Sequence, residues 1–171
     1  MNRNNSTYSK LVDLFVLAVF VPFIVVITVP FAVVVLFYWL ITTFVLYVLV
    51  WILWCTRGKD VMFVYSNSPI WHDYIEQQLI PRIAKRTVIL NWSERRHWLH
   101  RLSLSSLVFR FFGGSREYNP LALHFRPFRT HRTFRFWKAF KEWKHGNAKT
   151  LQQVETDLFD SIGIQNSIED R

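Results

Sequence analysis

The chain begins with an apolar stretch that is much longer than one membrane span. Between Leu11 and Cys55, forty-five positions, Asp13 is the only charged residue. A membrane helix needs about 20 apolar residues to cross about 30 Å of hydrocarbon. At about 1.5 Å per residue, this stretch would form a helix roughly 68 Å long, about twice that thickness. The pattern therefore predicts a membrane-anchored chain in which the stretch meets the bilayer more than once.

Two prolines are the only helix-breaking residues in this stretch, and they indicate where the chain would turn. Pro22 and Pro30 each lack a backbone N–H, and a proline disfavours helical geometry in the residue before it. A turn at Thr28–Pro30 would leave one arm on either side, Leu11–Ile27 and Phe31–Cys55. We therefore expect an N-terminal hydrophobic helical hairpin, formed either by two full transmembrane spans or by a re-entrant segment that dips into the bilayer.

Basic residues on both flanks of the apolar stretch predict its orientation. Arg3 and Lys10 precede the stretch, and Arg57 and Lys59 follow it. Positive charge beside a membrane segment favours the cytoplasmic side. We therefore expect an integral membrane protein with both termini in the cytoplasm, which agrees with a hairpin.

After the apolar stretch, the pattern changes to short apolar runs that alternate with amphipathic segments. Three runs without polar alternation are typical of strands buried on both faces. Ser68 and Ser93 are suitable N-caps for the helices that follow the first two runs. The expected strands are 61–65, 87–90 and 121–125, and the expected helices start at Ser68, run from Ser93 to Phe111, and lie near 131–145 and 148–162.

This order of elements predicts a small three-layer α/β domain with a short, mostly parallel sheet. An antiparallel third strand is the main alternative. We accordingly divide the chain into four parts: a cytoplasmic N-terminal tail at 1–10, the membrane hairpin at 11–55, a basic cytoplasmic α/β domain at 56–165, and a tail at 166–171.

Composition and charge exclude several classes of protein. Hydrophobic residues make up 51% of the 171 residues and aromatics 18%, too many for a disordered chain. The single Cys55 excludes a disulfide framework and a cysteine-based zinc site within one chain. The net charge is +9, and residues 82–149 hold sixteen basic residues against three acidic ones. Residues 150–171 carry five acidic residues against Arg171, so this segment is expected either to fold back on the basic region or to remain solvated.

Polar residues follow each expected strand, where open α/β sheets bind their ligands. A helix start beside arginine side chains is suited to a phosphorylated or nucleotide-like small molecule. The ordinary alternative is that these residues are caps and turns, and we favour it because the chain has no glycine-rich phosphate motif. The candidates are Glu94, Ser66 and Asn91 for catalysis, and Asn67, Ser68, Ser93 and Arg126 for ligand binding. No metal site and no cofactor are predicted.

The clearest local pattern is a repeat of basic and aromatic residues with a period of three, from Phe125 to Lys144. Such a surface attracts polyanions, either the anionic lipid of a membrane or nucleic acid. A domain tethered close to a bilayer meets lipid far more often, so nucleic acid is the less favoured partner. The surface residues are Arg129, Arg132, Arg135, Lys138, Lys141 and Lys144, with Trp137 and Trp143.

The sequence therefore predicts a membrane-anchored binding or scaffolding module whose basic-aromatic surface faces anionic lipid or another polyanion. The alternative is a small enzyme, or a domain that binds a phosphorylated ligand, with its site at the strand ends. No feature of the sequence indicates a particular reaction or oligomeric state.

Overall fold

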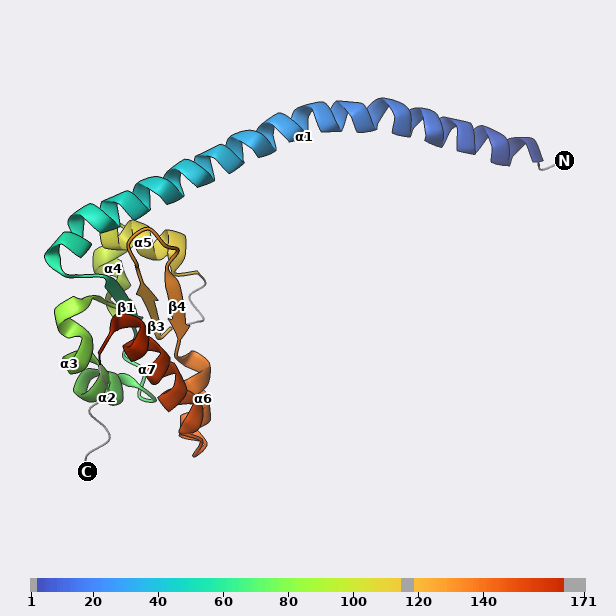
Figure 1. The fold of residues 1–171 in the computed structure, drawn as a ribbon. Coiled ribbons are helices and arrows are strands. Elements are labelled where there is room, and N and C mark those ends of the chain that lie inside the picture. The colour runs from blue at the N-terminus through green and yellow to red at the C-terminus, as the bar shows by residue number, and fades with distance from the viewer. Residues whose placement is uncertain (1–2, 115–118, 165–171) are drawn as a thin grey trace. The chain divides into compact units, whose positions relative to one another are not determined.

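The computed structural model describes residues 3–114 and 119–164, so the predicted tail at 166–171 lies outside the described residues. The chain divides into two compact units between Phe44 and Val45. Helix α1, Arg3–Leu53, makes up the described part of the first unit and continues into the second. Figure 1 shows α1 as a single unbroken helix. The prediction of a long apolar helical segment is confirmed.

The predicted turn at Thr28–Pro30 is absent, because α1 passes through both Pro22 and Pro30 without ending. An internal proline removes one backbone hydrogen bond and bends a helix, but it ends the helix only when other interactions favour another backbone path. Between Leu14 and Cys55 the chain contains no charged residue and no glycine or asparagine that would favour a turn. The structure therefore has one continuous helix in place of the hairpin.

The apolar side chains of α1 are exposed along most of its length. From Phe15 to Val45, twenty-four large hydrophobic side chains have exposed fractions of 44% or more. The segment Phe15–Arg57 is long and apolar enough to be a candidate membrane span, and its most apolar part is not buried inside the protein. A core helix of a soluble domain would be buried, and the apolar region of a signal peptide would be about 7–15 residues long.

The second unit is built on a four-stranded mixed sheet with the order β2-β1-β3-β4. Strands β1 (Val61–Tyr65) and β2 (Thr87–Asn91) are parallel, with Val61 opposite Thr87. Strand β3 (Leu121–His124) is antiparallel to β1, and β4 (Arg132–Arg135) is antiparallel to β3. The prediction of a mostly parallel sheet is therefore wrong, and the third strand has the orientation that was considered as the alternative.

Strands β2 and β3 are joined by α4 (Arg95–Trp98) and α5 (Leu104–Phe112), which are separated at residues 99–103. Ser103 starts α5 as an N-cap, because its Oγ accepts the Ser106 backbone N–H at 3.3 Å. Helix α5 ends with Phe112, whose ring packs against that of Phe125, directly after β3, with ring centres 5.7 Å apart. Strand β3 begins with Leu121, at the other end of the strand from Phe125, so the chain changes ends of the sheet between Phe112 and Leu121 and β3 runs antiparallel to β1.

Strand β4 replaces the first part of a predicted helix near 131–145. Arg132–Arg135 pairs with β3 at the edge of the sheet, and the helix starts later, as α6 (Trp137–Lys144). The predicted last helix is present as α7 (Lys149–Ile162). The remaining short elements are η1 (Cys55–Arg57), α2 (His72–Tyr74), the π-helical η2 (Ile75–Leu79), α3 (Ile80–Ile83), η3 (Ala84–Arg86) and η4 (Trp92–Glu94).

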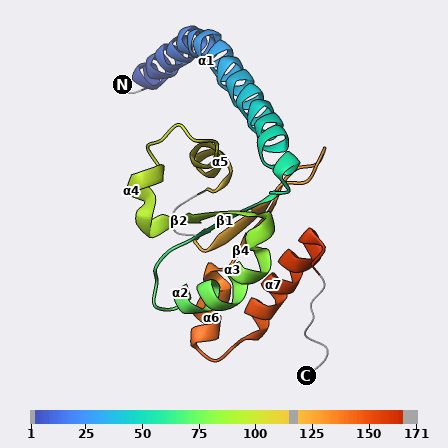
Figure 2. The ribbon, with the colours of Figure 1, turned by 90° about the vertical axis from the view of Figure 1, so that its left-hand side faces the viewer.

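Helices pack against both faces of the sheet, as Figure 2 shows. One hydrophobic cluster joins β1 residues such as Phe63 to α2, α3, α6 and α7. The other joins Met62 and Val64 of β1 to α5 and to the last turns of α1. Val50 and Trp54 of α1 are buried in that second cluster. The second compact unit begins at Val45, inside α1.

Two ends of the sheet are distinguished below. At the proximal end β1 and β2 begin and β3 stops, so it holds Val61, Thr87 and His124. At the distal end β1 and β2 stop and β3 begins, so it holds Tyr65, Asn91 and Leu121. Because α1 leads directly into β1, the proximal end is the end closest along the chain to the apolar helix.

Candidate functional site

The distal end brings together three of the predicted ligand-site residues in a closed ring of hydrogen bonds. Asn91 Nδ2 donates to Asn67 Oδ1 at 2.6 Å, and the Ser93 backbone N–H donates to Asn91 Oδ1 at 2.9 Å. The Asn67 backbone N–H closes the ring on Ser93 Oγ at 2.9 Å. These groups satisfy one another, so the ring joins the loops after β1 and β2 as capping residues would.

The neighbouring candidates also have structural partners. The carbonyl of Ser66 accepts the Trp71 indole N–H at 3.1 Å, and the carbonyl of Ser68 accepts the His72 N–H at 2.9 Å. Glu94 is exposed. Burial raises the pKa of Tyr65, as do its hydrogen bond to Glu76 and the nearby charge of Glu94.

Arg126 does not join the distal site. It follows β3, and β3 ends at the proximal end because it is antiparallel to β1. Its guanidinium instead donates to the Thr130 carbonyl at 3.3 Å, within the loop that joins β3 to β4. The other predicted ligand-binding residues, Asn67, Ser68 and Ser93, therefore lie apart from that arginine, since the orientation of β3 was predicted incorrectly.

The predicted basic-aromatic surface is an extended band and not one face. Arg129 lies in the β3–β4 loop at the proximal end, whereas α6 starts at the distal end after β4. Side chains alternate between the faces of a strand, so Arg132 and Arg135 of β4 point to opposite faces. The aromatic residues of the repeat divide between the core and the surface. Phe125, Phe136 and Phe140 are fully buried, whereas Phe128, Trp137 and Trp143 are exposed.

On α6 the exposed residues pair with one another. Lys141 Nζ lies 4.3 Å from the centre of the Trp137 ring, and Lys138 forms an ion pair with Glu142 at 3.7 Å. Lys144 and Trp143 line a hollow of about 390 Å³ together with residues of α2. The α6 part of the band is therefore a solvated helix face with cation–π and ion-pair contacts of its own.

The acidic helix α7 folds back on the basic band, one of the two arrangements expected for residues 150–171. Asp157 and Asp160 share a hollow of about 410 Å³ with Arg132 and Phe134 of β4. Arg132 therefore faces carboxylates across this hollow, and it is less available to an external anion than Arg129.

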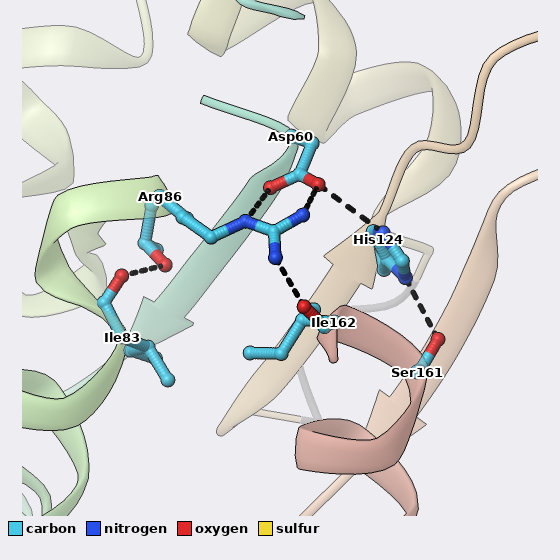
Figure 3. A network of polar contacts seen from close by, with 7 residues as sticks. Asp60, Ile83, Arg86, His124, Ser161 and Ile162 are labelled. Carbon is cyan, nitrogen blue, oxygen red and sulfur yellow. Dashed lines mark hydrogen bonds and ion pairs between the residues drawn. The ribbon is translucent and has the colours of Figure 1, made fainter. Parts of the chain in front are cut away.

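The most connected polar network lies at the proximal end (Figure 3). Asp60 receives two hydrogen bonds from the Arg86 guanidinium, with Arg86 Nε at 3.1 Å from Oδ1, and His124 Nε2 lies 3.4 Å from Oδ2. His124 Nδ1 forms a hydrogen bond of 2.7 Å with Ser161 Oγ of α7. Arg86 also donates to the Ile162 carbonyl at the end of α7. The network therefore ties β1, η3, β3 and the last turn of α7 together.

The Asp60–His124–Ser161 sequence of contacts resembles a hydrolytic triad, but its surroundings oppose that chemistry. Ser161 lies in the last turn of α7, where the helix carbonyls carry partial negative charge. An attacking serine needs N–H donors to stabilise the oxyanion that forms, and a helix C-terminus has the opposite polarity. The Asp60 carboxylate is also held by Arg86, which weakens its support of an imidazolium. The arrangement is suited to holding α7 in place.

Asp60 is a carboxylate stabilised by this network. Burial raises its pKa, but the hydrogen bonds from His124 and Arg86 and the guanidinium charge outweigh burial, so its pKa lies below the usual value of 3.8. A carboxylate with a lowered pKa contributes to stability above its unfolded pKa and loses that contribution as the pH falls through the folded pKa. The network is therefore intact at neutral pH and fails in acid.

A second junction at the proximal end joins α1 to the β3–β4 loop. The His131 backbone N–H donates to Tyr47 Oη at 3.1 Å, and Tyr47 Oη also lies 2.7 Å from His131 Nδ1. The His131 ring is packed among Tyr47, Phe112 and Phe125, with ring centres 4.8 Å apart for Phe112. Burial lowers the pKa of His131, which favours the neutral form of its ring.

Comparison with known proteins identifies no relative, since no protein-family model, no curated protein and no solved structure matches this chain. The functional argument therefore depends on the geometry of this chain alone.

Sequence reasoning missed both proximal junctions. Asp60, Arg86 and His124 stand at strand boundaries, but their meeting depends on the antiparallel orientation of β3, which the sequence pattern left open. Tyr47 lies within the apolar stretch, and the sequence there does not distinguish an aromatic residue that contacts the domain from one that contacts lipid.

Asp60→Asn should destabilise the domain by about 1–3 kcal/mol at pH 7, since it breaks a largely buried ion pair. The lower part of that range is expected because Arg86 is 40% exposed and water screens its charge. Urea unfolding of the full chain in mild detergent measures the effect. The variant should also lose less stability than the parent below pH 4, because it has no carboxylate to protonate.

Asp73→Asn, at an exposed position, is the matched control and should leave the unfolding midpoint unchanged.

Proposed function

We propose that this protein is a membrane-anchored binding module, in which α1 inserts into a bilayer and holds the basic domain against an anionic lipid surface on the cytoplasmic side. The observation that carries the proposal is the exposure of α1. Burying one large apolar side chain stabilises a protein by about 1.5–3 kcal/mol. Twenty-four such side chains exposed between Phe15 and Val45 therefore represent a driving force on the order of tens of kcal/mol toward an apolar environment.

The polar groups of α1 are compatible with that environment. A helix satisfies its own backbone hydrogen bonds, which is the requirement for crossing hydrocarbon. The Thr43 hydroxyl donates to the Trp39 carbonyl at 2.7 Å within the same helix. A β-sheet edge or an irregular loop in this position would leave backbone groups unpaired in the lipid.

The length of α1 limits how it can lie in the membrane. Its 51 residues extend roughly 77 Å at 1.5 Å per residue, more than twice the hydrocarbon thickness. A straight transmembrane orientation would therefore leave much of its apolar surface in water. Bending inside the bilayer avoids this, and the weakest points are Pro22 and Pro30, where the helix lacks a backbone hydrogen bond. Together with basic residues on both flanks, this favours both termini on the cytoplasmic side.

Topology is tested by glycosylation in a translation system containing microsomes. One site is made in the exposed turn between α6 and α7 by Lys149→Thr, which completes an Asn147-Ala148-Thr motif. A second site is placed on an N-terminal extension of about 30 residues, so that it clears the membrane surface. We expect neither site to be modified in membrane-integrated chains. Modification of the extension alone would show a single crossing, and modification at Asn147 would place the domain in the lumen; either result contradicts the proposed topology.

Binding to anionic lipid is tested by chemical footprinting of the full chain reconstituted in vesicles. Guanidinium- and amine-reactive reagents are applied in neutral phosphatidylcholine vesicles and in vesicles with phosphatidylserine. A basic residue near an anionic surface gains about 1 kcal/mol, so we expect the Arg129 modification rate to fall about fivefold with the anionic lipid. Equal rates for every basic residue in both vesicles would contradict the proposal.

The α6 lysines serve as an internal comparison in the same experiment. Lys138, Lys141 and Lys144 lie beyond the distal end. If the domain meets the membrane with its proximal end, these lysines keep their reactivity while Arg129 is protected. If α6 is protected as well, the domain lies flat on the lipid along the whole basic band, which also supports lipid binding.

A further inference from the structure

We propose that the β3–β4 loop, Arg126–His131, is the element that enters the lipid interface, with Phe128 inserting among the acyl chains and Arg129 binding anionic lipid phosphates. The inference rests on the proposed membrane anchoring of α1 and assigns the lipid contact to one loop. Its basis is the position of this loop against the part of α1 that adjoins the apolar segment.

The loop is fixed to α1 by two aromatic side chains of α1 that lie one helical turn apart, Tyr47 and Trp51. Tyr47 holds His131 through the hydrogen bonds to its backbone N–H and its ring. Trp51, one turn further along α1, contacts Phe128 with ring centres 5.2 Å apart. Tyr47 follows Phe44, the last residue of the apolar unit, by only three positions. If the apolar segment is in the bilayer, Tyr47 and Trp51 lie at headgroup depth, where such residues are enriched, and the loop lies there with them.

Phe128 has features that the folding of the domain does not explain. Its side chain is 89% exposed, although the neighbouring Phe125 is fully buried. Its backbone φ is +56°, a left-handed conformation that is unfavourable for a bulky residue. An exposed phenylalanine that also strains the backbone contributes little to the core, and local strain of this kind is concentrated at functional positions. Trp51 contacts the Phe128 ring, and a bilayer interface would supply apolar contact to the large exposed remainder of the side chain.

The charge of the surrounding segment matches an anionic surface. From Phe125 to Trp137 the chain has four arginines and no acidic residue. Arg129 is exposed beside Phe128, and a hydrogen bond from its backbone N–H to the Arg126 carbonyl, 3.3 Å long, closes the turn. An apolar side chain beside a cation is the combination that interfacial membrane anchors use. Nucleic acid could also use an aromatic and an arginine, but the junction with α1 places this pair beside the bilayer.

Fluorescence of a polarity-sensitive nitrobenzoxadiazole dye at position 128 tests the inference. Cys55→Ala removes the single native thiol, and Phe128→Cys is then labelled in the full chain reconstituted in vesicles. We expect blue-shifted emission, quenched at least twofold by lipid-borne nitroxides, with phosphatidylserine present. The matched control is Trp137→Cys, an exposed aromatic position beside Lys138 beyond the distal end, which should keep water-like emission.

Phe128→Gly in the otherwise native chain provides a second test that does not depend on the label. Glycine adopts positive φ freely, so the variant should unfold at the same or a higher temperature. It should nevertheless lose most of the protection of Arg129 in anionic vesicles, whereas Phe128→Trp should retain it. A merely structural role for Phe128 predicts the reverse, a less stable domain with unchanged footprinting.

The loop assignment would be overturned if the dye at position 128 keeps water-like emission while footprinting shows that anionic lipid protects the chain. The proposed function would still stand in that case. Protection of other basic residues without protection of Arg129 would overturn the loop assignment alone, and equal modification rates for every basic residue in both kinds of vesicle would overturn both. Tight binding of single-stranded nucleic acid to the reconstituted chain, lost in Phe128→Gly, would assign the loop to that partner and also overturn the inference.

Discussion

The apolar side chains of α1 have to leave water, and the folded domain begins within the same helix. Val50 and Trp54 lie in the hydrophobic cluster with β1 and β3, while large apolar side chains between Phe15 and Phe44 are exposed. The last turns of α1 are therefore part of the domain core, and no polar linker separates them from the apolar segment.

The proximal end is also where the domain is tied together most strongly. Asp60 lies between η1 and β1, and through Arg86 and His124 it connects the parallel strand pair to β3 and to the end of α7. Tyr47 and His131 connect α1 to the loop after β3. The distal end, where α/β enzymes commonly bind their ligands, is instead closed by the mutual hydrogen bonds of Asn67, Asn91 and Ser93. This distribution favours a domain that presents its proximal end to a surface over one that holds a substrate at its strand ends.

Several elements could be predicted from the sequence because their patterns are local. The buried runs that became β1, β2 and β3 and the amphipathic α7 follow from periodicity. The direction of β3 could not be predicted, since α5 ends beside Phe125 and the chain then starts β3 from its other end, which no local pattern in the sequence indicates. For the same reason Arg126 was placed at the wrong end of the sheet. Asn67, Asn91 and Ser93 lie together because they follow two strands that are parallel and adjacent. The three-residue repeat could be recognised in the sequence, but which of its aromatic residues are buried depends on β4. The position of β4 could not be predicted, because a strand at a sheet edge is stabilised by its neighbour more than by its own sequence.

The central claim, that α1 lies in a bilayer, is tested most directly by spin labels placed one at a time from Phe15 to Phe44 in the reconstituted chain. The account predicts frequent collision of the labels with oxygen, which dissolves in lipid, and rare collision with a water-soluble nickel chelate along this segment. The ratio of the two collision rates should be highest for the labels that lie deepest in the bilayer. Collision with the nickel chelate throughout the segment, or labels immobilised by protein contact, would show that another surface covers α1 and would contradict the account.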